Sequence, residues 1–486
     1  MGGGIIQLYA IGKQDKPLIG NPQITFFKQM YKRYTNFGIE QIKQYFTGNI
    51  NLGQRIRCKI QRKGDLLSNM YVVFDICKSD CLQQIPIRKL GLKLIEYIDI
   101  EIGGQLIDRH YGEWLDVWSQ LSHTYEEYQM TKILMGDSER INIFNTSNNK
   151  IYVPLYFWFN RDPGLALPLL SLQFHEVNIY LKLRPASQIF YFPNTKYGLP
   201  RKDPRGNKET LSCENNESAN CGHDCSSFFD TFYDKYKPPV PSACMCTSQV
   251  KSTSGSGSGY NTWVKKSIAK DDIIFNGIYL VCDYIFLSSE ERKLFVNKPL
   301  EYLITQVQCT GKVTIASPLC SNGGSQKSTN TEMILNFNYP VKEIYWCIYP
   351  TFFDNSYIYK NMDLSNTMIK GELFVNNTRY HNITDYNYFS IVQPYQHHKC
   401  GGLIGPGTGI NTNGGFYTYS FSLDPETKQP NGTLNFSKIN DCVLNFTYQK
   451  TNNRYSIIDV PYVFMGFGLS YNVLRIYEGM GKLEYI

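Results

Sequence analysis

A weak internal repeat constrains the fold of this chain more than any other feature of its sequence. Four short stretches of the first half have faint counterparts, in nearly the same order, in the second half. The pairs are Glu40 and Ile42 with Glu301 and Leu303, SNMYVVF around Tyr71 with KEIYWCI around Tyr345, EVNIYLKL (176–183) with CVLNFTYQ (442–449), and CDYIFL around Tyr284 with LSYNVL around Tyr471. Ordered matches of this kind predict one β-rich unit that is used twice. A unit doubled within one chain indicates a building block rather than a catalyst.

The spacing of these pairs predicts an insertion in the first half. The first three pairs match at nearly constant offsets, whereas positions 284 and 471 of the last pair lie much closer together. Roughly 75 to 85 residues must therefore be extra between positions 183 and about 275, and we place them in a loop at about 187–270. This window contains a cysteine cluster and the run Ser-Thr-Ser-Gly-Ser-Gly-Ser-Gly at 252–259.

Length and composition agree with two packed units. A chain of 486 residues with 42% hydrophobic and 14% aromatic residues can fill two cores of about 200 residues each. The net charge of +7 is unevenly placed, because eleven Lys and Arg residues precede position 64 against only Asp15 and Glu40. Two interpretations stay open for this basic region: a solvated face, or contact with an acidic partner, membrane headgroups or nucleic acid.

The sequence shows neither a secretory signal nor a membrane span. MGGGIIQLYAIGK has no basic start before an apolar core, and the longest apolar run is LALPLLSLQF at 165–174. We therefore expect a chain made in the cytosol with mostly reduced, core-filling thiols. Cys58, Cys77, Cys282 and Cys347 are the candidates for such core positions.

Period-two alternation of apolar and polar residues predicts strands throughout the chain. It is clearest at 56–61, 98–102, 177–183 and 444–449, and it is typical of antiparallel sandwiches with one face on a core. One region differs. Between Tyr111 and Met135, the residues Trp114, Val117, Trp118 and Leu121 recur at helical spacing, which predicts an amphipathic helix between strands.

Several long motifs, in order, resemble those of the double jelly-roll major capsid proteins of nucleocytoplasmic large DNA viruses. The N-terminal GGGIIQLYAIGKQD and NPQITFFKQMYKRYTNF are similar to the family's arm and first strand. The remaining motifs are IEIGGQLIDRHYGEWLDVW (100–118), VPLYFWFNRDPGLALPLLSLQFHEV (153–177), DYIFLSSEERKLF (283–295) with LEYLITQVQ, and YNVLRIYEGMGKLEY (471–485). The resemblance covers most of the chain outside roughly 187–270.

The resemblance implies an all-β fold of two tandem eight-stranded antiparallel jelly-roll sandwiches with short inserted helices. The implied division is an N-terminal arm at 1–23, a first jelly roll at 24–296 that carries the insertion, and a second jelly roll at 297–486. We take the strand before the insertion as the sixth of its jelly roll, and the strand after it as the closing one.

The implied function is that of a major capsid protein whose homotrimers are pseudo-hexameric capsomers of an icosahedral shell. Further implied partners are neighbouring capsomers, minor capsid proteins and an inner viral membrane, without specific nucleic-acid recognition. Assembly in a virus factory of the host cytoplasm is expected. The alternative is a minor capsid paralogue or a transient membrane scaffold of the same fold.

No motif predicts an enzyme or a cofactor. The glycine-rich GGLIGPGTG at 401–409 is not followed by Lys-Ser or Lys-Thr, so it does not match a phosphate-binding loop. His397 and His398 near Cys400 lack the His-x-His and carboxylate pattern of a jelly-roll metal site, and we interpret them as a surface pair. The run Glu-Glu-Arg-Lys at 290–293 is interpreted as a solvated turn.

Two sets of residues remain candidate sites. Five cysteines lie close together in the insertion, and with His223 they are candidates for zinc binding or for disulfides, against free exposed thiols: Cys213, Cys221, Cys225, Cys244 and Cys246. Asn-x-Ser/Thr triplets, which an asparagine-rich chain also yields by chance, occur at Asn145, Asn216, Asn376, Asn382, Asn431, Asn435 and, within an alternating run, Asn445.

Overall fold

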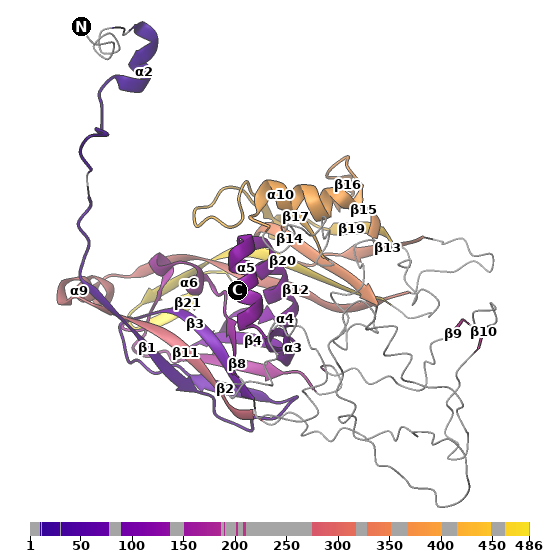
Figure 1. Ribbon diagram of the computed structural model, residues 1–486, viewed down its shortest axis with the longest axis horizontal. Helices are drawn as coiled ribbons and strands as arrows, with labels where there is room; N and C mark the ends of the chain where they lie inside the picture. The colour runs from indigo at the N-terminus through magenta and orange to yellow at the C-terminus, as the bar shows by residue number, and fades with distance from the viewer. Residues whose placement is uncertain are drawn as a thin grey trace, which may run out of the picture.

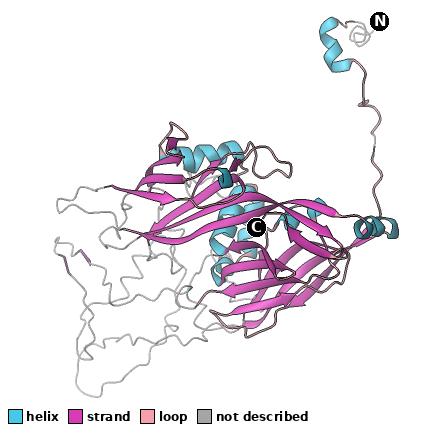
Figure 2. Cartoon of the chain, turned by 180° about the vertical axis from the view of Figure 1, so that it is seen from behind, coloured by secondary structure: helices cyan, strands magenta, loops and turns pink. Residues whose placement is uncertain are grey.

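The computed structural model describes a β-rich body with an extended N-terminal arm (Figure 1). The described residues are 10, 12–29, 31–76, 89–136, 150–185, 189, 201–202, 208–209, 275–316, 328–350, 368–400, 416–448 and 462–485. All strand pairs among them are antiparallel. Strands dominate the body in both views, with short helices set between them (Figure 2).

The first half forms two sheets. Sheet A1 has the order β1-β11-β3-β6, with β7 paired to β3, and sheet B1 has the order β2-β8-β4-β5. Their bounds are β1 Phe37–Tyr45, β2 Arg55–Lys59, β3 Leu66–Ile76, β4 Ile95–Ile102, β5 Gln105–Tyr111, β6 Lys150–Pro154, β7 Leu167–Pro168, β8 Val177–Leu183 and β11 Phe275–Leu287.

The second half repeats this order strand for strand. Sheet A2 has the order β12-β20-β14-β17, with β18 and β21 at its margins, and sheet B2 has the order β13-β19-β15-β16. The bounds are β12 Leu300–Ile315, β13 Thr329–Ile334, β14 Pro340–Pro350, β15 Met368–Val375, β16 Thr378–Arg379, β17 Phe416–Ser420, β18 Leu434–Asn435, β19 Cys442–Tyr448, β20 Tyr462–Tyr477 and β21 Met480–Leu483. The eight main strands of each half can be counted in chain order if the short strands β7, β9, β10, β18 and β21 are left out. In both halves, strands one, eight, three and six then form one sheet, and strands two, seven, four and five form the other. The predicted pair of eight-stranded jelly rolls is confirmed.

The sequence repeat identifies the equivalent strands but not their register. Its four pairs fall on β1 and β12, β3 and β14, β8 and β19, and β11 and β20. Glu40 lies opposite Tyr284, however, whereas Glu301 lies opposite Arg475 rather than the matched Tyr471. The repeat therefore reports a common topology and not a residue-for-residue register.

The connection between the last two strands carries the extra residues. Residues 184–274 link β8 to β11, whereas residues 449–461 link β19 to β20, so the first connection is several times longer. The difference between the two connections agrees with the predicted insertion. The strand before it was taken as the sixth of the jelly roll; this is wrong, because β8 lies between β2 and β4 as the seventh.

The predicted amphipathic helix is present, but it is divided. α4 (Gly112–Ser122) buries Trp114, Trp118 and Leu121, and α5 (Tyr125–Leu134) follows after His123 and Thr124. A second prediction is wrong. Residues 290–293 are not a solvated turn but part of helix α9 (Ser289–Asn297), in which Arg292 pairs with Asp65 at 2.8 Å. The turn was predicted from four charged residues, without the Ser288 side chain that caps the helix.

The other described short elements connect strands or belong to the arm. They are η1 Lys13–Asp15, α2 Lys16–Ile19, α3 Leu90–Leu94, α6 Trp158–Arg161, η4 Pro163–Leu165, β9 Arg201–Lys202, β10 Lys208–Glu209, the π-helical η7 Tyr388–Val392, α10 Gln393–His397 and η8 Phe436–Lys438. No helix among the described residues combines the length and apolar character needed to cross a membrane.

The N-terminal arm leaves the body at the end where α9 lies (Figures 1 and 2). No helix or strand is found in the described residues between α2 and β1. Its aromatic side chains are open to solvent, with Phe26 90% and Phe27 99% exposed. The arm therefore gains little from packing on its own chain.

The break between α4 and α5 yields a test of local stability. Thr124 Oγ1 accepts a hydrogen bond from Glu127 N at 3.4 Å, and Glu127 Oε2 accepts one from Thr124 N at 2.9 Å. Replacing Thr124→Ala removes this capping box, which typically costs about 1 kcal/mol, so the amides in the first turn of α5 should exchange roughly fivefold faster. Hydrogen exchange measures this directly. Thr124→Ser keeps the hydroxyl and is the control; equal acceleration in both variants would contradict the role of the cap.

Candidate functional site at the junction of the two jelly rolls

Sheet A2 is buried on both faces. Along β14, Ile344, Trp346 and Ile348 point into the core of the second jelly roll, while Tyr345 and Cys347 point into a core that includes the first jelly roll. β20 alternates in the same way, with Phe464 in one core and Met465 and Phe467 in the other. A sheet covered on both sides needs a nearly continuous apolar sequence, and the first eleven residues of β20 are all buried.

The first jelly roll covers the outer face of sheet A2 with the segment between its fifth and sixth strands. Helices α4 and α5 lie beside the strands of sheet A2 in the middle of the body (Figure 1). The Tyr111 ring at the end of β5 is 6.1 Å from the Phe467 ring on β20. At the far end of α4, Leu121 O accepts a hydrogen bond from Cys400 N at 2.8 Å. The two jelly rolls thus share one core cluster.

A buried carboxylate fixes β5 to β12. Asp108 is 3% exposed, and its Oδ1 accepts a hydrogen bond from Val307 N at 2.9 Å. Next to it, the Gln306 side chain donates to Ile107 O. The first contact satisfies a backbone group of the edge strand β12, and the second satisfies a backbone group of the edge strand β5. They also fix how far β12 can slide along β5.

His110 holds Asp108 in place. Its Nε2 lies 2.8 Å from Asp108 Oδ2, and its ring lies between Trp114 at 4.4 Å and Phe157 at 4.3 Å. Burial lowers the pKa of His110, although the neighbouring Asp108 acts in the opposite direction. The neutral ring therefore donates one N–H to the carboxylate. This is a positioning contact within an aromatic core.

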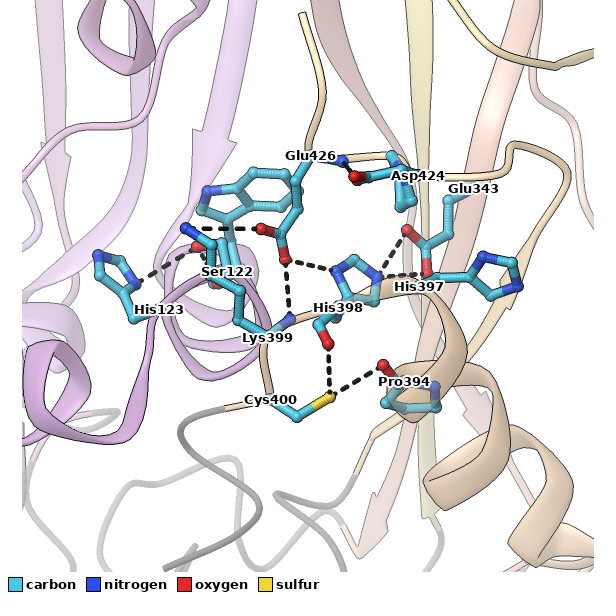
Figure 3. Close-up of polar contacts among 12 residues, drawn as sticks. Ser122, His123, Glu343, Pro394, His397, His398, Lys399, Cys400, Asp424 and Glu426 are labelled. Carbon is cyan, nitrogen blue, oxygen red and sulfur yellow. Dashed lines mark hydrogen bonds and ion pairs between the residues drawn. The ribbon is translucent and has the colours of Figure 1, made fainter. Parts of the chain in front are cut away.

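A second buried polar cluster lies at the other end of the junction (Figure 3). The His398 side chain is fully buried, and its Nε2 lies 2.9 Å and 3.0 Å from the two carboxylate oxygens of Glu343 on β14. Its Nδ1 lies 3.0 Å from Glu426 Oε1. Tyr345 OH donates to Glu343 Oε2 at 2.7 Å. Burial lowers the pKa of His398, but Glu343 and then Glu426 outweigh it and raise the pKa to about 9. His398 is therefore an imidazolium held between two carboxylates at neutral pH.

Two more buried cations approach these carboxylates. Arg161 on α6 donates from Nε to Tyr156 O at 2.7 Å and lies 4.2 Å from the Trp118 ring; burial lowers its pKa to about 10. Lys342 on β14 donates from Nζ to Pro425 O at 2.7 Å, and burial, followed by the charge of Arg161, lowers its pKa to about 8. Buried charges are costly unless they are paired. Removing one member of the cluster therefore leaves the remaining charges buried without a partner.

Three residues near this site were singled out from the sequence, and they differ in how far they are buried: His397, His398 and Cys400. The interpretation of His397 and His398 as a surface pair is wrong for His398, because β14 and the loop after β17 enclose it. His397 is partly exposed and makes a hydrogen bond with Leu423 O at 2.9 Å. Cys400 donates from Sγ to Pro394 O at 2.9 Å, and burial raises its pKa to about 12, so it stays a thiol. No group of three metal-ligating side chains occurs among the described residues.

The remaining predicted residues divide between described and undescribed parts of the chain. Cys58, Cys282 and Cys347 are buried, as predicted for core thiols. The insertion cysteines with His223, as well as Cys77, Asn145, Asn216 and the 401–409 loop, lie outside the described residues. Their roles stay predictions.

Five triplet asparagines can be located. Asn445 lies within strand β19, and Asn382 is exposed. The other three make local hydrogen bonds: Asn376 accepts from Asn440 N at 2.8 Å, Asn431 donates to Asp424 O at 2.8 Å, and Asn435 accepts from Ser437 N at 3.1 Å. These contacts explain why asparagine stands at such turns. Glycosylation of any candidate triplet stays a prediction.

Two charged residues of this site stand out in the sequence, although they were not predicted as site residues. Glu343 interrupts the apolar run KEIYWCI, and Arg161 interrupts the aromatic run LYFWFNR. A charge inside a buried strand or helix requires a partner. The partners could not be identified, because His398 and Glu426 both lie far from Glu343 along the chain.

Comparison with known proteins places the chain in a family. A profile described as the major capsid protein N-terminus matches residues 25–208, and one described as the large eukaryotic DNA virus major capsid protein matches residues 291–482. The major capsid protein of Pyramimonas orientalis virus is 32% identical over the full length of both chains. The chain belongs to the major capsid protein family of large eukaryotic DNA viruses.

Further matches agree. The major capsid protein of Paramecium bursaria Chlorella virus 1 is 31% identical over the full length of both chains. The quasi-atomic PBCV-1 virus capsid shares the fold with a TM-score of 0.66 and 26% identity, covering 95% of this chain and all of the other. This capsid protein is therefore structural and non-enzymatic, and copies of it form the shell of a large DNA virus. These matches favour a shell protein over the alternative of a minor capsid paralogue or a transient scaffold.

The enclosed imidazolium makes the second jelly roll sensitive to alkaline pH beside the junction. Because the pKa of His398 rises from 6.5 to about 9 on folding, its stabilising contribution is complete below pH 6.5 and is lost as the pH rises through about 9. The stability difference between the wild type and His398→Gln should therefore shrink between pH 7 and pH 10. Thermal unfolding across this range measures it.

The neighbouring histidine is the control for this pH dependence. His397→Gln removes a histidine next in sequence whose described hydrogen bond is with the backbone oxygen of Leu423 rather than with a carboxylate, so it shows what the loss of a nearby imidazole does without the loss of the ion pairs. A pH-independent difference for His398→Gln would mean that His398 is not charged in the folded chain.

Proposed function

We propose that three copies of this capsid protein form a trimer in which six jelly rolls complete a pseudo-hexagonal capsomer. The observation that carries this proposal is the strand-for-strand agreement of the two halves. Two equivalent wedges per chain make six per trimer, so a block with six similar sides needs only threefold symmetry. Such a block can tile a flat facet of an icosahedral shell.

The junction supplies the geometry for this arrangement. Its shared core and its polar contacts, from Val307 N to Asp108 and from Cys400 N to Leu121 O, hold the two jelly rolls of one chain at a fixed angle. A fixed angle between neighbours is what a closed ring requires, because small errors would accumulate around it. The ring then closes when the same relation recurs between chains.

The domain boundaries follow from the same proposal. A break at 296/297 falls at the end of α9, just before β12 begins, which suits a linker between the jelly rolls. The arm was placed at 1–23. Since the first strand begins at Phe37, we propose that the functional arm extends to residue 36.

Further partners belong to the same proposal. The arm carries Lys13, Lys16, Lys28, Lys32 and Arg33 against Asp15 alone, and its aromatic residues are exposed. We propose that it reaches the inner side of the shell, where minor capsid proteins or an inner viral membrane would receive it. Assembly would take place in a virus factory of the host cytoplasm, without specific nucleic-acid recognition.

The trimer can be tested with the purified chain. Light scattering coupled to size-exclusion chromatography should give three times the chain mass of 56.1 kDa, in solution or after mild dissociation of virions. A stable monomer or dimer as the sole assembled species would overturn the pseudo-hexameric capsomer.

The arm can be tested by truncation. Removing residues 1–20 should leave the trimer intact, because the described part of this segment lies away from both jelly rolls (Figure 1). Assembly of capsomers into shells should be impaired, as seen by electron microscopy of assembly reactions. Failure of the truncated chain to fold would show instead that the arm belongs to the core.

A further inference from the structure

The guanidinium of Arg161 lies at the junction without a carboxylate beside it. Its Nε donates to Tyr156 O at 2.7 Å, its Nη1 lies 3.4 Å from Thr305 Oγ1, and the Trp118 ring lies 4.2 Å away. Its Nη2 is buried and has no hydrogen-bond partner among the described residues. The ion pairs found in the described part of the chain do not include Arg161. A buried charged donor of this kind requires a partner.

Lys342 is a second such cation, and it belongs to the other jelly roll. It is 1% exposed and lies where the register of β14 with β20 shifts between Val341 and Glu343. Its Nζ donates to Pro425 O at 2.7 Å and to Thr427 O at 3.3 Å, but no ion pair among the described residues includes it. The two carbonyl oxygens satisfy two of its three N–H groups, so one donor remains and the charge has no counterion.

Tyr471 on β20 lies close to both cations. The Lys342 Nζ is 4.8 Å from the centre of the Tyr471 ring. Thr305, which Arg161 approaches, is opposite Tyr471 in the ladder between β12 and β20. After burial, the charge of Arg161 is the strongest influence that lowers the pKa of Lys342, as expected for like charges held near each other. The hydroxyl of Tyr471 is itself buried and has no partner in the described part of the chain.

The carboxylates of this region already have other partners. Glu343 and Glu426 hold His398 between them (Figure 3). Asp424 is partly exposed and accepts a hydrogen bond from Glu426 N at 2.9 Å. Asp108 belongs to the polar contacts at the other end of the junction. None of these four carboxylates forms a described ion pair with either of the two cations.

The charges of the enclosed groups do not balance. Three positive charges, on Arg161, Lys342 and the His398 imidazolium, stand against the two carboxylates that hold His398. A water molecule would complete the hydrogen bonds of the two cations, but it would leave one positive charge in excess. A small anion would accept the same hydrogen bonds and also balance the charge.

We propose that the junction binds one small monovalent anion, of which chloride is the simplest, between Arg161 of the first jelly roll and Lys342 of the second. Arg161 Nη2, the third N–H of Lys342 and the hydroxyl of Tyr471 donate to it. Because the two cations come from different jelly rolls, the ion links them. All of its ligands belong to one chain, so the inference does not rest on the proposed trimer.

Thermal unfolding of the purified chain tests the link. Sodium chloride is compared with sodium gluconate at the same ionic strength, since gluconate is too large for an enclosed site of this kind. Above the dissociation constant, each tenfold rise in chloride should multiply the ratio of folded to unfolded chain by about ten, whereas gluconate should not. Arg161→Met and Lys342→Met should both lose this dependence on chloride.

Lys428→Met is the matched control. Lys428 is also a cation at the junction, but its side chain is 62% exposed and it pairs with Asp162 at 2.7 Å. Its removal changes the charge of the same region without touching the proposed ligands. This variant should therefore keep the full dependence on chloride.

Bromide locates the ion directly in the wild type. Crystals grown with sodium bromide should show an anomalous difference peak between the Arg161 guanidinium and the Lys342 ammonium. If no peak appears there and chloride and gluconate give equal stability, water completes the site and the inference is wrong.

The other outcomes also decide. A bromide peak without any effect of chloride on unfolding would indicate an adventitious ion only and would overturn the link. Stabilisation by chloride that persists in Arg161→Met and Lys342→Met would mean that the ion binds elsewhere. If both variants fail to fold, the bromide peak and the chloride dependence of the wild type together decide.

Discussion

Two-sided burial of sheet A2 is the constraint on which the rest of the structure depends. Its strands supply half of the core of the second jelly roll and, from their other face, part of the core of the first. The packing is tight at Gly468, where a Cβ atom would lie 3.1 Å from the Phe337 ring. Since each half contributes to one shared cluster, neither jelly roll has a complete surface of its own. The two jelly rolls are consequently joined by a shared core as well as by the short linker between α9 and β12.

Apolar contact alone would not fix how the wedges are aligned, because hydrophobic burial has no direction. The polar contacts at the two ends of the junction supply that direction. At one end Asp108 accepts from Val307 N, and at the other Leu121 O accepts from Cys400 N. A shift of one jelly roll along the other would leave the Asp108 carboxylate and buried backbone groups without partners, at several kcal/mol each. These polar contacts therefore define one alignment.

The sequence predicted those features that depend on local pattern. Alternation in β2 and β19 gives the burial expected for strands with one face on a core, and helical spacing gives α4. The local pattern gave wrong predictions of burial where residues distant in the sequence surround a side chain. Asp99 occupies a polar position of the alternating β4, yet it is fully buried because Arg109 pairs with it at 2.6 Å. His398 looked like a surface residue for the same reason: its partners are distant in sequence, and only the fold brings them together.

The outer sides of sheets A1 and A2, which point away from the core of their own jelly roll, show how one fold can serve two kinds of contact. The contact within a chain forms once, during folding, and need never be exposed, so it can hold a continuous apolar surface and enclosed charges such as Glu343. A surface that contacts a neighbouring chain must first remain soluble while it is free. On the side of sheet A1 that points away from its own core, apolar residues are interleaved with polar ones: Lys43 lies over the Tyr279 ring, and Asn69 donates to Asp283. Aromatic rings with polar neighbours can face water before assembly and still bury large areas afterwards.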